Sequence, residues 1–332
     1  MRKQIFAALS LLPLLSFAQT SKETFAEKLG FPKGKKVVIM HIDDAGMSYD
    51  ANLGTIRALK EGVANSVSVM MPTPWVPGFL HFLKENPEVD AGLHLTLTSE
   101  WKSYRWGPLA GKPAVPSLVD HEGALWRSVH EVVKNGTPDE VEREIMAQIE
   151  RARTAGFEPT HLDSHMGTLF ATPEFLERYV KVGIQEKIPV MLPAGHNSLI
   201  FKSEGLSKQQ QGMIQQLGQQ VWEAGLPVLD DLHNESYGWV PANKATISRG
   251  ELQKFKTKKY IEGLEEIKPG LTMVIMHCTH PTEVFEHISD SGITREGDLL
   301  AMIDPALKAY IERQGIILTT WREVMERRQA IR

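Results

Sequence analysis

Residues 36–42 read Lys-Val-Val-Ile-Met-His-Ile, and the acidic pair Asp43-Asp44 follows them directly. An almost unbroken apolar run of this length is typical of a strand that is buried on both faces of a parallel sheet. The sequence therefore predicts a parallel sheet built around residues 36–42. Further β-rich runs lie at residues 66–71, 91–97, 160–165, 188–192, 271–277 and 315–319.

Helical patterns fill the gaps between these runs. Thr137 is predicted to cap one helix, with Pro138 at the first position and Glu140 three residues after the cap. Thr172 followed by Pro173 predicts a second helix start of the same kind. Strands and helices alternate over roughly 290 residues, which favours one (β/α) barrel over a two-domain protein.

Two segments interrupt this alternation, and we expect both to be long loops or insertions on the barrel rim. Residues 193–245 hold a Gln-rich, helix-like stretch and a polar run at 230–235. Residues 99–127 hold Trp101, Trp106 and two further aromatic residues among Gly and Pro. Aromatic rings stack on sugar faces or pack within a loop, and both interpretations stay open for these residues.

Composition excludes several classes of protein. The chain has 332 residues with 37 Lys and Arg against 41 Asp and Glu, a net charge of −4. A nucleic-acid-binding protein would carry a basic excess, so none of its partners is expected to be a nucleic acid. Cys278 is the one cysteine, which excludes an internal disulfide and a zinc site made of several thiolates.

The N-terminus has the pattern of a secretory signal peptide. Arg2 and Lys3 precede an apolar run over residues 5–15 that is too short to cross a bilayer, and Ser16-Phe17-Ala18 offers small residues for cleavage. A membrane anchor or buried helix is disfavoured because residues 19–23 are polar. We therefore expect residues 1–18 to be removed near Ala18. The mature chain would then be periplasmic or secreted, with no integral membrane segment.

Polar residues cluster where predicted strands end. Asp43 and Asp44 are adjacent carboxylates beside an apolar strand, so they repel each other unless a cation neutralises them. The alternative is that one of them caps the following helix. His94 stands inside the apolar run 91–97, where a histidine is either a hydrogen-bonded core residue or a metal ligand.

A third cluster contains His161, Asp163 and His165. The two-residue period of a strand turns all three side chains to one face. Ordinary core packing does not accommodate three such groups, so they must be paired, solvated or bound to metal. With an aspartate of the first cluster, two histidines from separate strands match the two-imidazole, one-carboxylate set of catalytic metal sites with open positions.

At these residues the sequence resembles the YdjC-like carbohydrate deacetylase family, which includes the chitooligosaccharide deacetylases. It is more distantly similar to the NodB-type polysaccharide deacetylases. The resemblance implies a distorted TIM-like barrel over residues 27–330, one divalent metal ion, and hydrolysis of an N-acetyl group on a sugar. The matching segments are residues 43–48, 62–70, 92–98 and 160–165, then His280-Pro281, Arg295-Glu296 and residues 315–318.

Carried over residue by residue, the resemblance implies that Asp44, His94 and His165 bind the metal. It implies that Asp43 is the general base and that His280 is the general acid. The family's usual histidine after the Asp-Ser-His segment is replaced here by Gly167, and its glycine after His-Pro by Thr282. We further expect Asp163 and His161 to support the ligands, Asp163 by a hydrogen bond to a ligand imidazole or else as an ordinary ion pair. The candidates for substrate binding are Trp101, Trp106 and Arg295.

The expected function is therefore that of an exported, metal-dependent hydrolase acting on a carbohydrate. Imidazole-rich ligation suits Zn²⁺, whereas the family resemblance implies Mg²⁺, so the metal stays open. A metal-dependent esterase or phosphoesterase on the same barrel is the alternative, although the site segments lack clustered Lys or Arg. A catalytically silent glycan-binding protein is disfavoured by the intact acidic pair. The sugar and the oligomeric state are not predicted.

Overall fold

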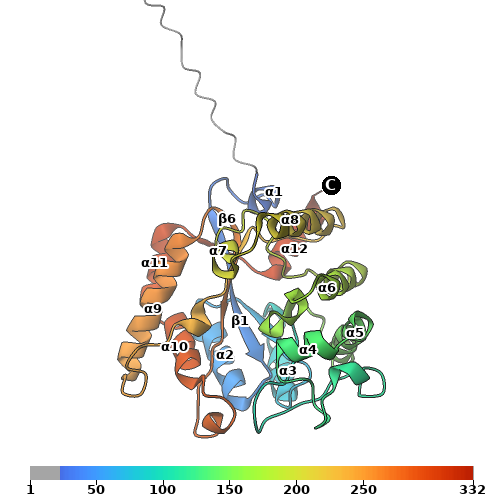
Figure 1. Cartoon of the computed structure of the whole chain (residues 1–332). Helices are drawn as coiled ribbons and strands as arrows, with labels where there is room; N and C mark the ends of the chain where they lie inside the picture. Colours follow the sequence, from blue (N-terminus) through green and yellow to red (C-terminus); the bar gives the residue numbers. More distant parts are fainter. Residues whose placement is uncertain (1–22, 332) are drawn as a thin grey trace, which may run out of the picture.

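The computed structural model describes residues 23–331 and places β1, Lys36–Ala45, at the centre of a parallel sheet (Figure 1). The strand order is β4-β3-β2-β1-β6-β5, and β7 pairs with the first residues of β1 beside β2. The other strands are β2 Ser66–Val69, β3 Ala91–Leu95, β4 Leu162–Ser164, β5 Asp231–His233, β6 Gly270–Met276 and β7 Ile317–Leu318.

Isolated bridges continue the sheet from β4 round to β5. Leu162 pairs with Val190, and Pro193 pairs with Leu229, both in parallel. Residues 188–192, predicted as a strand, therefore contribute single bridges rather than a regular strand. With them the sheet curls round, and the predicted distorted TIM-like barrel is confirmed.

The segment 193–245 differs from a simple rim loop. It contains α8, Lys208–Glu223, and it supplies β5 to the sheet. The sequence did not predict β5 because residues 230–235 are polar, and the carboxylates in this run bind backbone groups rather than water. Asp231 accepts the N–H groups of Leu199 and Leu232, and Asp230 accepts those of Phe25 and Leu271.

Helices surround the sheet on its outer side (Figure 1). Thr137 precedes α5 and Thr172 precedes α6, as predicted, and the Thr172 side chain accepts the N–H of Phe175. The helices are α1 Phe25–Lys28, α2 Tyr49–Glu61, α3 Val76–Glu85, α4 Val129–Asn135, α5 Pro138–Thr154, α6 Pro173–Glu186, α7 Ile200–Glu204, α9 Arg249–Glu266, α10 Gly292–Met302, α11 Pro305–Gln314 and α12 Trp321–Ala330. Short 3₁₀ turns lie at Pro116–Leu118, His165–Phe170 (η2), Ser236–Gly238 (η3) and Phe285–His287.

Successive side chains of β1 point to opposite faces of the sheet, and along one of these faces an apolar layer is followed by a polar one. Val38, Met40 and Ile42 belong to the large core, whereas Val37 and Ile39 pack in a second core with Leu271, Met273 and Trp321. His41 and Asp43 follow on the same face as Val37 and Ile39, because side chains two residues apart share a face. A buried polar layer therefore lies above an apolar one, toward the carboxyl end of β1.

The predicted signal peptide, residues 1–18, lies outside the described residues. Across residues 23–331, no helix combines the length and apolar character that a membrane crossing requires.

Candidate active site

Three side chains that are remote in the sequence meet at the carboxyl ends of β1, β3 and β4. Asp44 Oδ1 lies 3.3 Å from His94 Nε2 and 3.3 Å from His165 Nδ1. All three residues are buried. The structure thus brings together Asp44, His94 and His165, the residues expected to bind a metal.

A bulge in β1 turns Asp43 and Asp44 toward the same site. The pairing with β2 advances three residues from Ile42 to Ala45 on β1 but two on β2, so β1 carries an extra residue. Asp44 takes the left-handed conformation there, with φ of 68°. In a regular strand two neighbouring side chains point to opposite faces, so the bulge is what places both carboxylates together.

The donor set fits a divalent cation. Asp44 Oδ1 is buried and has no hydrogen-bond partner, although two imidazole nitrogens lie 3.3 Å away. Ligands that bind Zn²⁺ tetrahedrally at about 2.0–2.1 Å stand about 3.3 Å from one another. The spacing of His94 and His165 around this oxygen is therefore that of ligands sharing one ion.

The helix-cap interpretation of the acidic pair is wrong. α2 begins after Ser48, whose side chain accepts the N–H of Ala51. Asp44 instead pairs through Oδ2 with Arg295 Nη1 at 2.7 Å. Burial alone would raise the pKa of Asp44, but the Arg295 guanidinium and the neighbouring imidazoles outweigh it and hold the pKa well below its usual range.

This ion pair gives Arg295 a contact that the sequence did not predict. Its side chain is 3% exposed, and its Nε donates to Ser291 Oγ while Nη1 binds Asp44. The guanidinium is therefore directed at a candidate metal ligand rather than at a substrate.

Each candidate ligand imidazole has a carboxylate on its other nitrogen. His94 Nδ1 lies 2.6 Å from Asp163 Oδ1, in the hydrogen bond expected of Asp163. His165 Nε2 lies 3.0 Å from Oε1 of Glu100, in the loop after β3. Such partners fix the orientation and tautomer of a metal-binding histidine. Asp163 and Glu100 are therefore equivalent in their geometry toward the two rings.

His161 lies deeper in the barrel. Its ring stacks on Trp321, with centroids 5.2 Å apart, and its Nε2 is 3.9 Å from Asp163 Oδ2. A Cβ on Gly92 would stand 2.5 Å from a carbon of this ring, so only glycine leaves room for it on β3. His161 thus lies behind Asp163 and supports it at a distance rather than by a hydrogen bond.

Asp43 faces two histidines that sequence reasoning left without a role. His41 Nε2 lies 3.3 Å from Asp43 Oδ1, and His277 Nε2 lies 3.8 Å from Asp43 Oδ2. Burial lowers the pKa of His277. By contrast, His280 makes no ion pair with Asp43 or Asp44 among residues 23–331, and its backbone N–H donates to the carbonyl of Asp50. The histidines without a predicted role that lie beside the expected base are therefore His41 and His277.

The aromatic residues of the rim loop pack mainly on one another. Trp106 is 5% exposed, and its Nε1 donates to the carbonyl of Thr98. Little of this ring is therefore open to a sugar, and sugar stacking by Trp106 stays a prediction. Trp101 is half-buried, with its ring 5.4 Å from that of Trp106 and 6.5 Å from that of Tyr104, and it stays a candidate for substrate contact.

Sequence reasoning missed Glu100, His41 and His277 as members of the site. A signal existed for His41, because it stands two residues before Asp43 on one strand and so shares its face. His277 ends a predicted strand, which is also a detectable position. Glu100 is fixed by the path of a long loop, and no local pattern marks it.

The chain is similar to a known protein family and to several curated proteins. A model of the family described as YdjC-like protein matches residues 37–313. A carbohydrate deacetylase of Thermus thermophilus is 30% identical over 300 residues, covering 90% of this chain and 97% of the relative. A carbohydrate deacetylase of Geobacillus stearothermophilus is 25% identical over 295 residues, covering 86% of this chain and 96% of the relative.

One solved structure shares the architecture. It is a protein of Enterococcus faecalis V583 described as a candidate cellobiose-phosphate cleavage protein, with a TM-score of 0.69 and 19% identity. The match covers 87% of this chain and 99% of that protein. At this level of identity the likeness concerns the fold alone.

Proposed function

Because the chain belongs to the YdjC-like family, we propose that it is a metal-dependent hydrolase that removes the N-acetyl group from an amino sugar in an oligo- or polysaccharide. The observation that carries this proposal is the convergence of Asp44 with His94 and His165 at 3.3 Å around one unpaired carboxylate oxygen. The names of the relatives, which are carbohydrate deacetylases, support the substrate class.

The charge of the site supports both the cation and a neutral substrate. Asp43, Asp44, Asp163 and Glu100 bring four carboxylates together, and Arg295 supplies one guanidinium. Such a site attracts a divalent cation, and its guanidinium is already paired with Asp44, so it is not free to bind a phosphate group. An acetamido group is neutral and has a carbonyl that a cation polarises, so it suits the site better than a phosphoester.

In the proposed mechanism Asp44, His94 and His165 hold the cation. A divalent metal held there would supply Lewis-acid chemistry, that is, a lower pKa of water, toward about 7, and a polarised amide carbonyl. Asp43 accepts a proton from the attacking water through Oδ2, the oxygen that lies 3.8 Å from Nε2 of both His94 and His277. As the carbon–nitrogen bond breaks, a histidine donates a proton to the departing amine, which leaves acetate and the free amino sugar.

The donor is proposed to be His277 rather than His280. His277 Nε2 faces the same Oδ2 atom of Asp43, so a proton accepted by the carboxylate lies close to the group that must deliver one. The lowered pKa of His277, which burial causes, favours a ring that is neutral before the reaction. It therefore gains its proton during the reaction and then passes it on.

Acetate release from N-acetylated oligosaccharides tests the proposal. We expect release by the purified chain, loss after chelation, and recovery after Zn²⁺ or Mg²⁺ is restored. Asp44→Ala and His94→Ala should each lose bound metal and activity. His81→Gln, which changes an exposed histidine on α3, is the matched control. Full activity in the metal-stripped enzyme would contradict the scheme.

We also propose that the chain is exported after cleavage near Ala18. The basic start, short apolar run and small residues of 16–18 support this. Expression of the full chain in a Gram-negative host tests it by mass spectrometry of the periplasmic fraction. A mature N-terminus close to Gln19 is expected, and an intact Met1 in the cytoplasmic fraction would contradict export.

A further inference from the structure

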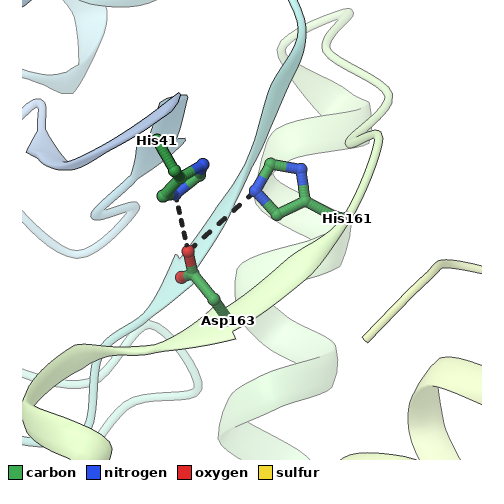
Figure 2. Close-up of side chains that lie close together, drawn as sticks. All are labelled: His41, His161 and Asp163. Carbon is green, nitrogen blue, oxygen red and sulfur yellow. Dashed lines mark ion pairs between the residues drawn. The ribbon is translucent and has the colours of Figure 1, made fainter. Parts of the chain in front are cut away.

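A second buried cluster lies inside the barrel, behind the three candidate metal ligands. His41 and His161 both point toward the carboxylate of Asp163 (Figure 2). His41 Nε2 is 2.9 Å from Asp163 Oδ2, and His161 Nε2 is 3.9 Å from the same oxygen. The three side chains are at most 1% exposed, so no bulk water reaches them.

His41 also contacts the other carboxylate of the cluster. Its Nε2 is 3.3 Å from Asp43 Oδ1, so one ring edge faces both Asp43 and Asp163. Neither oxygen has a hydrogen-bond partner elsewhere. On the neighbouring strand β2, Ser66 Oγ lies 2.9 Å from His41 Nδ1 and Ser68 Oγ lies 3.1 Å from Nε2. The ring is therefore held in one orientation by two hydroxyl groups.

The charges of the whole site require one more positive group. Four carboxylates face one guanidinium, so three negative charges remain, and a divalent cation bound by neutral imidazoles neutralises two of them. Burial lowers the pKa of both His161 and His277, and the neighbouring His41 lowers that of His161 further. The lowered pKa of each ring favours its neutral form. A proton on His41 supplies the missing charge where two unpaired carboxylate oxygens meet.

A second metal ion is the competing explanation for this cluster. Ligands of one ion stand at similar distances from one another, as they do at 3.3 Å around Asp44 Oδ1. In the cluster of His41 and His161 the distances to Asp163 Oδ2 are 2.9 and 3.9 Å. The shorter one is an ion-pair distance, so the unequal spacing favours an imidazolium over a second metal.

We propose that His41 is a positioning residue, a buried imidazolium that holds Asp43 and Asp163 with one edge of its ring. It fixes Asp43 Oδ1, which leaves Oδ2 directed at the reacting water. It also fixes Asp163 Oδ2, while Oδ1 of the same carboxylate orients His94. The inference rests on the proposed function for the role of Asp43, but the charge and contacts of His41 stand independently of it.

NMR of the metal-loaded protein with ¹⁵N-labelled histidine tests the charge directly. The His41 signals are identified by their loss in His41→Gln. We expect both ring nitrogens of His41 to carry a proton at neutral pH, the pattern of an imidazolium. A pattern with one protonated nitrogen would overturn the proposal whether or not the chain releases acetate.

Kinetics and metal analysis test the positioning role. His41→Gln should lower kcat about 10–100-fold, with KM and metal affinity within about twofold of wild type. A wild-type stoichiometry of two ions per chain, with one lost in His41→Gln, would overturn the imidazolium in favour of a second metal. Unchanged kcat would overturn the positioning role.

His233→Gln is the matched control. It removes a buried imidazole from β5, and His233 makes no ion pair in residues 23–331. We expect it to retain kcat, so a loss equal to that of His41→Gln would assign the effect to lost packing and overturn the proposal. If wild type releases no acetate from any substrate, the proposed function fails, while the NMR pattern and the metal stoichiometry still decide the state of His41.

Discussion

His165 is held by Glu100, whose Oε1 lies 3.0 Å from the ring nitrogen that faces away from Asp44. The same arrangement recurs at His94, where Asp163 occupies the nitrogen that faces away from Asp44. The two candidate ligand rings are thus fixed from behind by carboxylates of different origin. One stands on β4, inside the barrel, and the other stands on a rim loop.

Glu100→Gln should weaken metal binding about 10–100-fold, because outer partners of ligand histidines carry effects of this size. Competition against a chromophoric chelator measures the affinity. Glu122→Gln is the control, since Glu122 belongs to the same rim loop but pairs with Arg105 at the exposed surface. Equal affinities in Glu100→Gln and wild type would show that His165 needs no such partner.

Replacing His277 should damage catalysis more than replacing His280. We expect His277→Gln to lose at least about 100-fold in kcat with bound metal retained, as removal of a general acid does. His280→Gln, changed three residues away, should lose less. The two variants are compared at one pH with metal content measured in both. A larger loss in His280→Gln would return the acid role to His280.

Asp298→Ala should destabilise the fold by about 3–5 kcal/mol, because it leaves the buried ammonium of Lys256 unpaired. Lys256 Nζ lies 2.9 Å from Asp298 Oδ1, and both side chains are fully buried. The free energy of unfolding in urea measures the loss. Glu266→Ala breaks the exposed pair with Lys202 and should cost about 0–1 kcal/mol.

Asp298→Ala should also lower the activity of the protein that remains folded. Asp298 Oδ2 accepts the N–H of His277, so its loss frees the backbone of the proposed acid. We therefore expect the activity of Asp298→Ala, as a fraction of wild-type activity, to be lower than the fraction of the variant that is folded. Activity equal to the folded fraction would mean that His277 is positioned by other contacts.

The stability of the protein should decrease as the pH rises through about 9. Burial lowers the pKa of His41, but the carboxylates of Asp163 and Asp43 outweigh this and raise the pKa to about 9. An unfolded chain has a histidine pKa of about 6.5. The stabilisation is therefore complete below a pH of about 6.5 and is lost as the pH rises from there through about 9.

Urea unfolding of wild type and His41→Gln across this range measures the effect. In the metal-free protein burial lowers the pKa of His165, but the carboxylates of Glu100 and Asp44 outweigh this and raise it to about 9. The metal-free forms of the two proteins are therefore compared, so that their difference isolates His41 from the remaining groups. We expect this difference to shrink as the pH rises from about 6.5 to about 9. A constant difference would mean that His41 does not titrate there.

The barrel was predictable because it depends on sequence patterns, whereas Asp44, His94 and His165 were singled out as metal ligands by the resemblance to the YdjC-like family. The apolar run of β1 indicates a strand buried on both faces, and the spacing of His161, Asp163 and His165 is a period-two signal. β5 was missed because the side chain of Asp231 accepts backbone N–H groups of another segment. Hydrophobic periodicity does not register such a strand.

The role of Arg295 was unpredictable for a different reason. Its partner Asp44 is 251 residues away in the sequence, and the contact depends on how α10 packs against α2 and α9. Glu100 belongs to the same class, because a long loop sets its position. Local sequence patterns thus located site residues that lie on strands. The contacts around them, such as those made by Arg295 and Glu100, depend on tertiary packing and were not predicted.

The left-handed residue in β1 links the chemistry to the path of the backbone. Asp44 has φ of 68° within a strand whose other side chains alternate regularly. Asparagine and aspartate tolerate this conformation, whereas β-branched residues do not. Transplanting the dipeptide Asp-Asp into an unbroken strand of another barrel would therefore send one carboxylate outward to the helices. A design of this centre must therefore reproduce the β-bulge as well as the Asp-Asp dipeptide.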